Sequence, residues 1–229
     1  MEKPARAKIA GKQGDSKPEN WFPLSFFKKC GGFLRTGGRM SKKEFERFSM
    51  SQELFQMERE PDGTVLIKPL LAHGDGSREG ALGAFVFKWQ HSKNTGETFS
   101  SNVGIDLPDG STRSPDAVWV SDERLVGVSG EEFENEFLKA VPDFVAEFRT
   151  GVDNLELVKE KMSFIWMKNG VRLAWLIDPY EEKTYIYREN EELEIIAGFS
   201  GEKLSGEDVL PGFELPLDEM KSKKMKKRR

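Results

Sequence analysis

The sequence is poor in the residues that build disulfides and soft metal sites. Its 229 residues include one cysteine, Cys30, and two histidines, His73 and His91. A single cysteine excludes a disulfide within this chain and a zinc cluster made of cysteines, and two histidines argue against a histidine-rich metal site. Any bound metal is therefore expected to be a hard cation such as Mg²⁺, held by carboxylates.

Long apolar runs are also absent. No stretch approaches the roughly 20 apolar residues that a membrane-spanning helix needs. The first residues alternate Lys, Arg and Pro and lack the apolar segment of a signal peptide. A hydrophobic content of 37% beside 32% charged residues suits one globular domain with tails. These features predict a cytoplasmic protein with no membrane partner.

Charge is unevenly distributed along the chain. Residues 1–40 carry nine Lys or Arg and three acids, and residues 221–229 carry seven Lys or Arg and no acid. Because the net charge is -4, the segment 41–220 has a balance of about -17. An acidic body with basic ends is not typical of a duplex-binding surface. It argues against a simple nucleic-acid-binding module, and less against an enzyme whose metal ion offsets local charge.

The same distribution predicts three parts. Residues 1–40 form a basic N-terminal arm, 41–220 a folded domain, and 221–229 a basic tail that is too charged to fold alone. The arm is rich in Gly, Lys and Pro, with one apolar island at Trp21–Phe27. This island could dock onto a partner or a second copy, or the arm could fold back onto its own domain.

The start of the domain has clear local signals. Ser41 and Glu44 match a capping box, which predicts a helix from Lys42 to about Glu53. Apolar segments at 54–59 and 64–68 flank a Pro-Asp-Gly turn, the pattern of a β-hairpin.

The second half alternates helices and strands. Residues 77–90 have apolar residues at helical spacing. A helix is expected over 154–168, with Asp153 as its N-cap and Gly170 as a left-handed C-terminal cap. The continuous apolar run 173–177 predicts a strand buried on both faces. The fold class is α+β or α/β, with a mixed central sheet flanked by helices.

Two short strands carry acidic residues at the edge of apolar runs. The first is SPDAVWV at 114–120, with Asp116, and the second is PDFVAEFR at 142–149, with Glu147. A carboxylate inside an apolar strand is costly without a partner, which favours a functional role for Glu147. Two carboxylates followed by a helix with lysines could hold a divalent cation against a phosphodiester.

These motifs are part of an ordered series. The segments that carry it are 57–63, 114–120, 144–149, 170–179 and 210–213. The series resembles the Uma family of restriction-endonuclease-like proteins, which belongs to the PD-(D/E)XK nuclease superfamily. The resemblance covers about 41–217. It implies the restriction-endonuclease-like fold, in which a metal site lies at one edge of a mixed sheet.

The resemblance also implies roles for three acidic residues. Asp116 matches the motif aspartate that bridges to Mg²⁺ or Mn²⁺, and Glu147 matches the second acidic ligand. Glu58 resembles an early glutamate that often completes the metal site. Two of them also have an ordinary interpretation: Asp116 could accept hydrogen bonds in a turn, and Glu58 could lie on the surface of the hairpin.

The basic residue of the site is less clear. Arg149 stands where the superfamily has a lysine, and in the Uma pattern that lysine is typically on the following helix, where Lys161 is the best match. The stretch from Lys161 to Gly170 is one residue longer than expected, so Lys159 is the alternative. Arg149 cannot act as a base because its guanidinium stays protonated. It is a candidate phosphate contact, although direct pairing with Glu147 would weaken metal binding.

Three functions follow from this pattern. The first is a magnesium-dependent endonuclease that hydrolyses phosphodiester bonds of DNA. The second is an inactive protein of the same fold, serving as a DNA-associated or protein-interaction domain. The third is a homodimeric scaffold whose basic tails bind nucleic acid by charge. A homodimer is also an expectation of the resemblance. Trp119, Trp166 and Trp175 are interpreted as core residues rather than as platforms for bases.

Overall fold

A computed structural model of the chain describes residues 33–51 and 56–222. The expected arm up to residue 32, with its apolar island, and the tail from residue 223 lie outside the described residues. Within the described ranges, no helix is both long and apolar enough to cross a bilayer.

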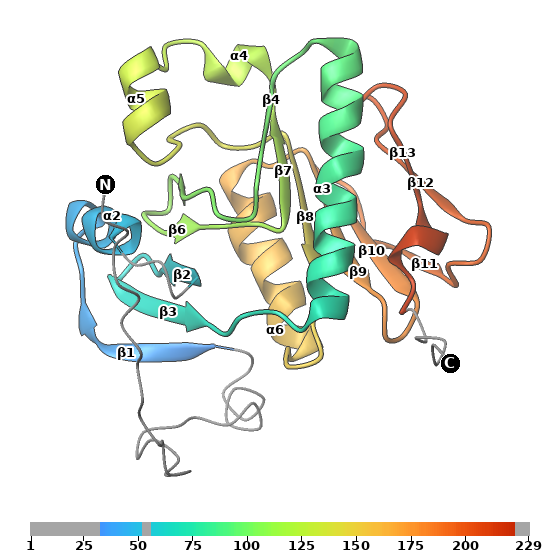
Figure 1. The fold of residues 1–229 in the computed structure, drawn as a ribbon, viewed down its shortest axis with the longest axis horizontal. Coiled ribbons are helices and arrows are strands. Elements are labelled where there is room, and N and C mark those ends of the chain that lie inside the picture. The colour runs from blue at the N-terminus through green and yellow to red at the C-terminus, as the bar shows by residue number, and fades with distance from the viewer. Residues whose placement is uncertain (1–32, 52–55, 223–229) are drawn as a thin grey trace, which may run out of the picture.

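A six-stranded mixed sheet forms the centre of the molecule (Figure 1). Its strand order is β11-β10-β9-β8-β7-β4. The strands β8 and β9 are parallel, whereas the other neighbouring pairs are antiparallel. The strands, in chain order, are β4 (Glu97–Phe99), β7 (Ala117–Val120), β8 (Phe144–Phe148), β9 (Leu173–Asp178), β10 (Lys183–Arg188) and β11 (Glu194–Ala197).

Helices cover both faces of this sheet. The long helix α3 (His73–Lys93) packs on one face, and α6 (Leu155–Glu160) with its continuations η1 (Lys161–Trp166) and η2 (Met167–Asn169) lies on the other (Figure 1). Because side chains alternate along a strand, β8 serves both layers. Phe144 and Ala146 belong to the core cluster of α3, and Val145 belongs to the cluster that contains Met162 and Trp166. The expected mixed sheet with flanking helices is confirmed.

A second, smaller sheet lies beside the first and has the order β1-β3-β2-β6-β5. Its strands are β1 (Leu34–Arg39), β2 (Gln56–Arg59), β3 (Thr64–Lys68), β5 (Ile105–Asp106) and β6 (Thr112–Arg113). β2 and β3 are the expected hairpin, whose turn tightens at Gly63 with a φ of +93°. β1 comes from the segment assigned to the arm, and it pairs with β3.

The remaining elements surround these two sheets. They are α2 (Lys42–Met50), α4 (Asp122–Leu125), α5 (Gly130–Asn135), a two-stranded sheet of β12 (Lys203–Ser205) and β13 (Glu214–Pro216), and η3 (Leu217–Met220). The capping box of α2 is confirmed, because the Ser41 amide donates to Glu44 Oε2 at 2.9 Å and the Glu44 amide donates to Ser41 Oγ at 3.3 Å. The helix ends at Met50, before the expected Glu53.

The helix after β8 differs from its prediction in two ways. Its N-cap is Asn154, whose Oδ1 accepts from the Glu156 amide at 2.9 Å, so the assignment to Asp153 was wrong. Asp153 instead accepts the Thr150 amide at 2.7 Å and tightens the preceding loop. The helix also widens into a π-helical turn over η1 before it ends at Gly170, which has the expected left-handed φ of +98°.

Candidate active site

A cavity of about 610 Å³ lies where the small sheet meets the central sheet and the α6–η1 helix. Its lining brings together side chains from four separate elements and one loop. They are Glu58 of β2, Lys68 of β3, Asp116 before β7, Glu147 of β8 and Lys161 of η1. The sequence predicted four of these five residues as site members.

Strand register brings Asp116 beside Glu147. In the antiparallel β7–β8 pair, Ala117 lies opposite Ala146 and Val118 opposite Val145. One further step of the same register brings Asp116 opposite Glu147, on the face covered by α6. The Asp116 Oδ2 atom also accepts the backbone N–H of Phe148 at 2.6 Å, which fixes the carboxylate at the edge of β8.

Glu147 is buried and held by two donors from η1. Lys161 Nζ lies 2.6 Å from Glu147 Oε1, and the indole N–H of Trp166 donates to the same oxygen at 2.9 Å. These contacts provide the partners that a carboxylate inside an apolar strand requires. Trp166 is a buried core residue as expected, and it also sets the orientation of Glu147.

A π-helical turn lies between Lys161 and Gly170, where the sequence is one residue longer than the resemblance implies. An i→i+5 turn accommodates one more residue than an α-helical turn does, and such turns are frequent at functional sites. Both ends of η1, Lys161 and Trp166, thereby reach Glu147. Lys159 faces elsewhere: its Nζ lies 3.0 Å from Glu156 Oε1 and 4.7 Å from the ring centroid of Tyr185.

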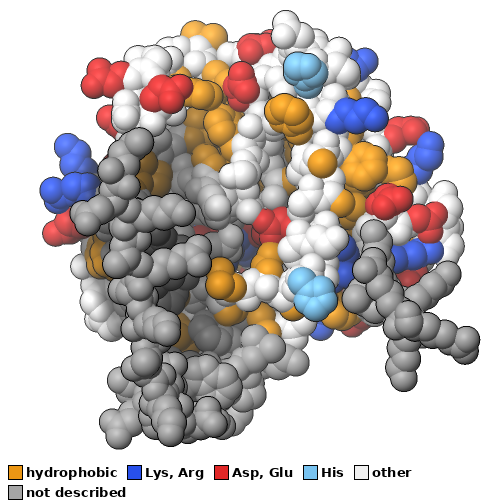
Figure 2. All heavy atoms as spheres, viewed as in Figure 1, with side chains coloured by type: hydrophobic (Ala, Val, Ile, Leu, Met, Phe, Trp, Pro, Cys, Tyr) orange, Lys and Arg blue, Asp and Glu red, His pale blue; other side chains and the backbone are white. Residues whose placement is uncertain are grey.

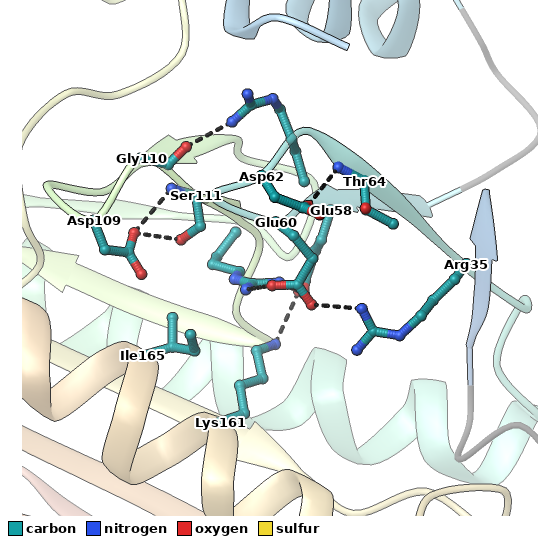
Figure 3. Close-up of polar contacts among 12 residues, drawn as sticks. Arg35, Glu58, Glu60, Asp62, Thr64, Asp109, Gly110, Ser111, Lys161 and Ile165 are labelled. Carbon is teal, nitrogen blue, oxygen red and sulfur yellow. Dashed lines mark hydrogen bonds and ion pairs between the residues drawn. The ribbon is translucent and has the colours of Figure 1, made fainter. Parts of the chain in front are cut away.

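Glu58 contacts three cations, and Figure 3 shows one of them, Lys161, reaching toward it. Its Oε1 atom lies 2.8 Å from Lys68 Nζ and 2.9 Å from Lys161 Nζ, and its Oε2 lies 3.3 Å from the Arg113 guanidinium. Burial alone would raise the pKa of Glu58, but Lys161, Lys68 and Arg113 hold that pKa well below its usual value. Glu58 therefore carries a full negative charge and positions both lysines.

Asp116 has the opposite environment. Its pKa is raised well above the usual value, first by burial and then by the charge of Glu147, with Lys68 opposing the shift. Burial alone would lower the pKa of Lys68, but Glu58, Glu147 and Asp116 raise it, so this lysine stays protonated. Strongly shifted carboxylates within a cavity are typical of functional sites.

Arg149 does not join this cluster. In the parallel pairing of β8 with β9, Phe148 lies opposite Ile177, so Arg149 comes beside Asp178. Its guanidinium lies 2.7 Å from Asp178 Oδ2 and 3.5 Å from Glu181 Oε1. Arg149 is not among the described residues that line the cavity, and these ion pairs direct its charge away from Glu147.

Sequence reasoning missed several charged residues near the site, among them Lys68, Arg113 and Glu79. Lys68 could have been found from the hairpin register, since Gln56 pairs with Lys68 and Glu58 with Leu66, which makes Lys68 a diagonal neighbour of Glu58. Glu79 lies on α3, and burial raises its pKa while Lys68 lowers it and Glu147 raises it. Glu79 is three residues before the buried Leu82, a spacing that directs both to the same helix face.

The acidic residues do not form a ready-made metal cage. Across residues 33–51 and 56–222, no group of three or more His, Cys, Asp or Glu is placed to hold a metal ion. The arrangement is instead a pair of neighbouring carboxylates, Asp116 and Glu147, with the Lys161 amine beside them. Chemically, such a set can supply anionic oxygens to a cation and N–H donors to a developing negative charge.

Comparisons with known proteins bear on the family and the fold. The model of the Uma2 family, described as "Putative restriction endonuclease", matches residues 43–218. No curated protein matches the chain. The fold is similar to the crystal structure of "a putative nuclease belonging to DUF820" from Anabaena variabilis, with a TM-score of 0.65 and 16% identity over 79% of this chain and 97% of that one. Since the family model spans most of the domain, the chain belongs to the Uma2 family.

Proposed function

We propose that this protein is a metal-dependent nuclease that hydrolyses phosphodiester bonds of DNA in the cavity described above. The observation that carries the proposal is the contact of Lys161 Nζ with Glu147 Oε1 at 2.6 Å, in the cavity that Asp116 also lines. Three residues from separate parts of the sequence thus meet at one point. Their types are those that the superfamily resemblance requires there.

The donor chemistry fits a hard divalent cation such as Mg²⁺ or Mn²⁺. Asp116 and Glu147 would hold the ion, because burial and then the charge of Glu147 raise the pKa of Asp116, and a cation would compensate both effects. When bound, such an ion makes a water molecule more acidic and stabilises charge on phosphate oxygens. Glu58 suits the role of metal ligand less well than the sequence suggested, since Lys68, Lys161 and Arg113 already surround it.

The protein's own cations have separate tasks. The Lys161 ammonium donates hydrogen bonds to the oxygen on which charge develops, a contact that is stronger in the transition state than in the substrate. Glu58 holds that ammonium at the cavity, and Trp166 keeps the Glu147 carboxylate in one orientation. Arg149 has no part in these steps, because Asp178 and Glu181 bind its guanidinium.

Two observations in the sequence favoured the inactive-domain alternative: Arg149 in place of the superfamily's lysine, and the acidic body. The contacts of Arg149 with Asp178 and Glu181 favour an active site over a degraded one. The acidic body remains an observation in favour of the alternative, and activity measurements separate the two.

The test is DNA cleavage by the full chain with Mg²⁺, with Mn²⁺ and with a chelator, on plasmid and on single-stranded DNA. Cleavage is expected only with a divalent ion. Glu147→Gln should abolish it, whereas Glu156→Gln, which alters an exposed helix carboxylate, should not. Calorimetry should show Mg²⁺ binding that Glu147→Gln weakens. A lack of both cleavage and metal binding would leave the inactive-domain function in its place.

A further inference from the structure

The cavity has an apolar wall that hydrolysis of a phosphodiester does not require. Leu70, Leu157 and Phe164 line it with exposed fractions of 79%, 40% and 64%. Exposed apolar side chains gathered around one cavity mark a binding site more often than isolated ones do. Phe164 is three residues after Lys161 on η1, so the exposed ring and the catalytic ammonium line the same cavity from one element.

The charge of the lining excludes binding by phosphate contacts alone. Among the described residues, seven acidic and four basic side chains line the cavity. Three of the four cations, Lys68, Arg113 and Lys161, already contact Glu58. The fourth, Arg35, lies 3.4 Å from Glu60 (Figure 3). A duplex gains most of its affinity from phosphate neutralisation, which such a lining cannot supply.

The face of the molecule drawn in Figure 2 also lacks a concentrated basic patch among the side chains that the structure describes. On the face drawn in Figure 2, the Lys and Arg side chains of the described residues stand among Asp and Glu rather than in one basic patch. An uncharged part of the substrate is therefore expected to contribute binding energy at the cavity.

We propose that the apolar wall receives a base of single-stranded nucleic acid, stacked on Phe164, with its phosphate beside Lys161 and the divalent ion that Asp116 and Glu147 would hold. This inference rests on the proposed function and narrows its substrate class. A cavity of about 610 Å³ is within the size range of ligand pockets and can admit one nucleotide. An exposed aromatic ring stacks any base without sequence preference. A paired base would first have to leave its duplex, which costs free energy.

The test uses the full chain with Glu147→Gln, so that hydrolysis does not affect the binding measurement. Fluorescence anisotropy compares three labelled DNA probes of equal length: a single strand, its duplex, and the single strand with abasic positions at its centre. Phe164→Ala should weaken single-strand binding about tenfold. It should leave the abasic and duplex affinities unchanged. Phe164→Trp should retain single-strand binding, because it keeps an aromatic surface.

Phe87→Ala is the matched control. Phe87 is 58% exposed, lies on α3, and is not among the described residues that line the cavity. Phe87→Ala should change single-strand affinity by less than about twofold, which is much less than the loss of one stacked base would cause. Attraction of the basic chain ends to DNA is common to both variants and cancels in the comparison.

Two results would overturn the inference. One is an equal effect of Phe164→Ala and Phe87→Ala on the single strand. The other is a loss on Phe164→Ala that is as large for the abasic strand or the duplex. Cleavage by the wild-type chain is scored separately. If the chain cleaves DNA but its binding does not depend on Phe164, the proposed function stands and this inference is rejected. If binding depends on the base and on Phe164 but no cleavage occurs, this inference stands and the proposed function is rejected.

Discussion

Glu58 lies among three cations, whereas Asp116 lies beside another carboxylate, Glu147. The two acids share one cavity, yet their charges act on folding in opposite directions. Removing one partner from a buried ion cluster leaves the other charges uncompensated and destabilises the folded state. Removing one of two charges that repel each other stabilises it. The same substitution, carboxylate to carboxamide, therefore has a different sign at each position.

Glu58→Gln is expected to lower the free energy of unfolding at pH 7 by about 3 kcal/mol, because Lys68, Lys161 and Arg113 lose their shared anion. The folded-state pKa of Glu58 is depressed, so its stabilisation is present above the unfolded value of about 4.3 and is lost as pH falls through the folded pKa. Urea unfolding at pH 7 and at acidic pH measures the difference. A wild-type advantage that stays constant into strongly acidic solution would contradict this account.

Asp116→Asn is expected to raise the free energy of unfolding by about 1 kcal/mol at pH 7 in a chelator, because it removes a buried charge that Glu147 also repels. The Asn carbonyl oxygen can still accept the Phe148 amide. Mg²⁺ should stabilise the wild type and not the variant, since a ligand stabilises the state that binds it. The matched control is Asp122→Asn at the start of α4. A variant less stable than the wild type in chelator would refute this argument.

At the scale of elements, the α6–η1 helix determines which lysine reaches the site. Lys159 and Lys161 are two residues apart, so they point about 200° apart around a regular helix and cannot both face the cavity. Lys161 contacts Glu58 and Glu147, whereas Lys159 contacts Glu156 and the Tyr185 ring. The direction in which each side chain leaves the helix therefore decides that Lys161, and not Lys159, lines the cavity.

The two lysines form a natural pair of variants. Lys161→Ala should reduce metal-supported cleavage about 100-fold, the usual effect of losing a donor to developing charge. Lys159→Ala should leave the rate within about twofold, as expected for an exposed ion pair. Calorimetry adds a second readout: Lys161→Ala should tighten Mg²⁺ binding, because the ammonium no longer competes for Glu147 Oε1. Equal rates for the two variants would show that the assignment of Lys161 is wrong.

The parts of this site that sequence could predict are those that the pattern of a single strand indicates. The acidic residues Asp116 and Glu147 stand out at the edges of apolar strands, and the apolar run at 173–177 predicts the buried neighbour β9, whereas the register that brings the two acids together comes from strand pairing. The π-helical turn could be seen only as a spacing one residue too long between Lys161 and Gly170. No local pattern distinguishes such a turn from an error of register, because its contacts with Glu147 are tertiary.

The contacts between the two sheets could not be predicted from the sequence either, because they are tertiary contacts that leave no local pattern. The sequence pattern predicts Lys68 only as the last residue of a hairpin strand, and its role at the cavity depends on where the small sheet meets the central one. The pairing of Leu34–Arg39 with β3 joins segments separated by the helix α2. Glycines at 37 and 38 lower the β propensity of that stretch, and pairing outweighs the propensity.

At the scale of the whole molecule, charge is divided between an acidic body and basic ends. The cavity follows the body, with more acidic than basic lining residues. A polyanionic substrate would therefore meet repulsion near the site and attraction at the chain ends. This division predicts that the ends contribute salt-dependent affinity and that the cavity contributes affinity that salt screens little.

Replacing the six Lys and Arg of residues 223–229 with Gln measures how much salt-dependent DNA affinity the basic tail contributes. The dependence of log Kd for single-stranded DNA on log salt concentration should become shallower by about 0.7 for each phosphate that the tail no longer neutralises. In about 0.5 M salt, where the Debye length falls below 5 Å, the variant and the wild type should bind equally. A control variant that replaces the exposed body lysines Lys43, Lys88 and Lys168 with Gln should keep most of the wild-type slope, because it leaves all six cations of the basic tail in place. If the tail variant instead bound more weakly by the same factor at every salt concentration, the tail would be making specific contacts rather than a general electrostatic one.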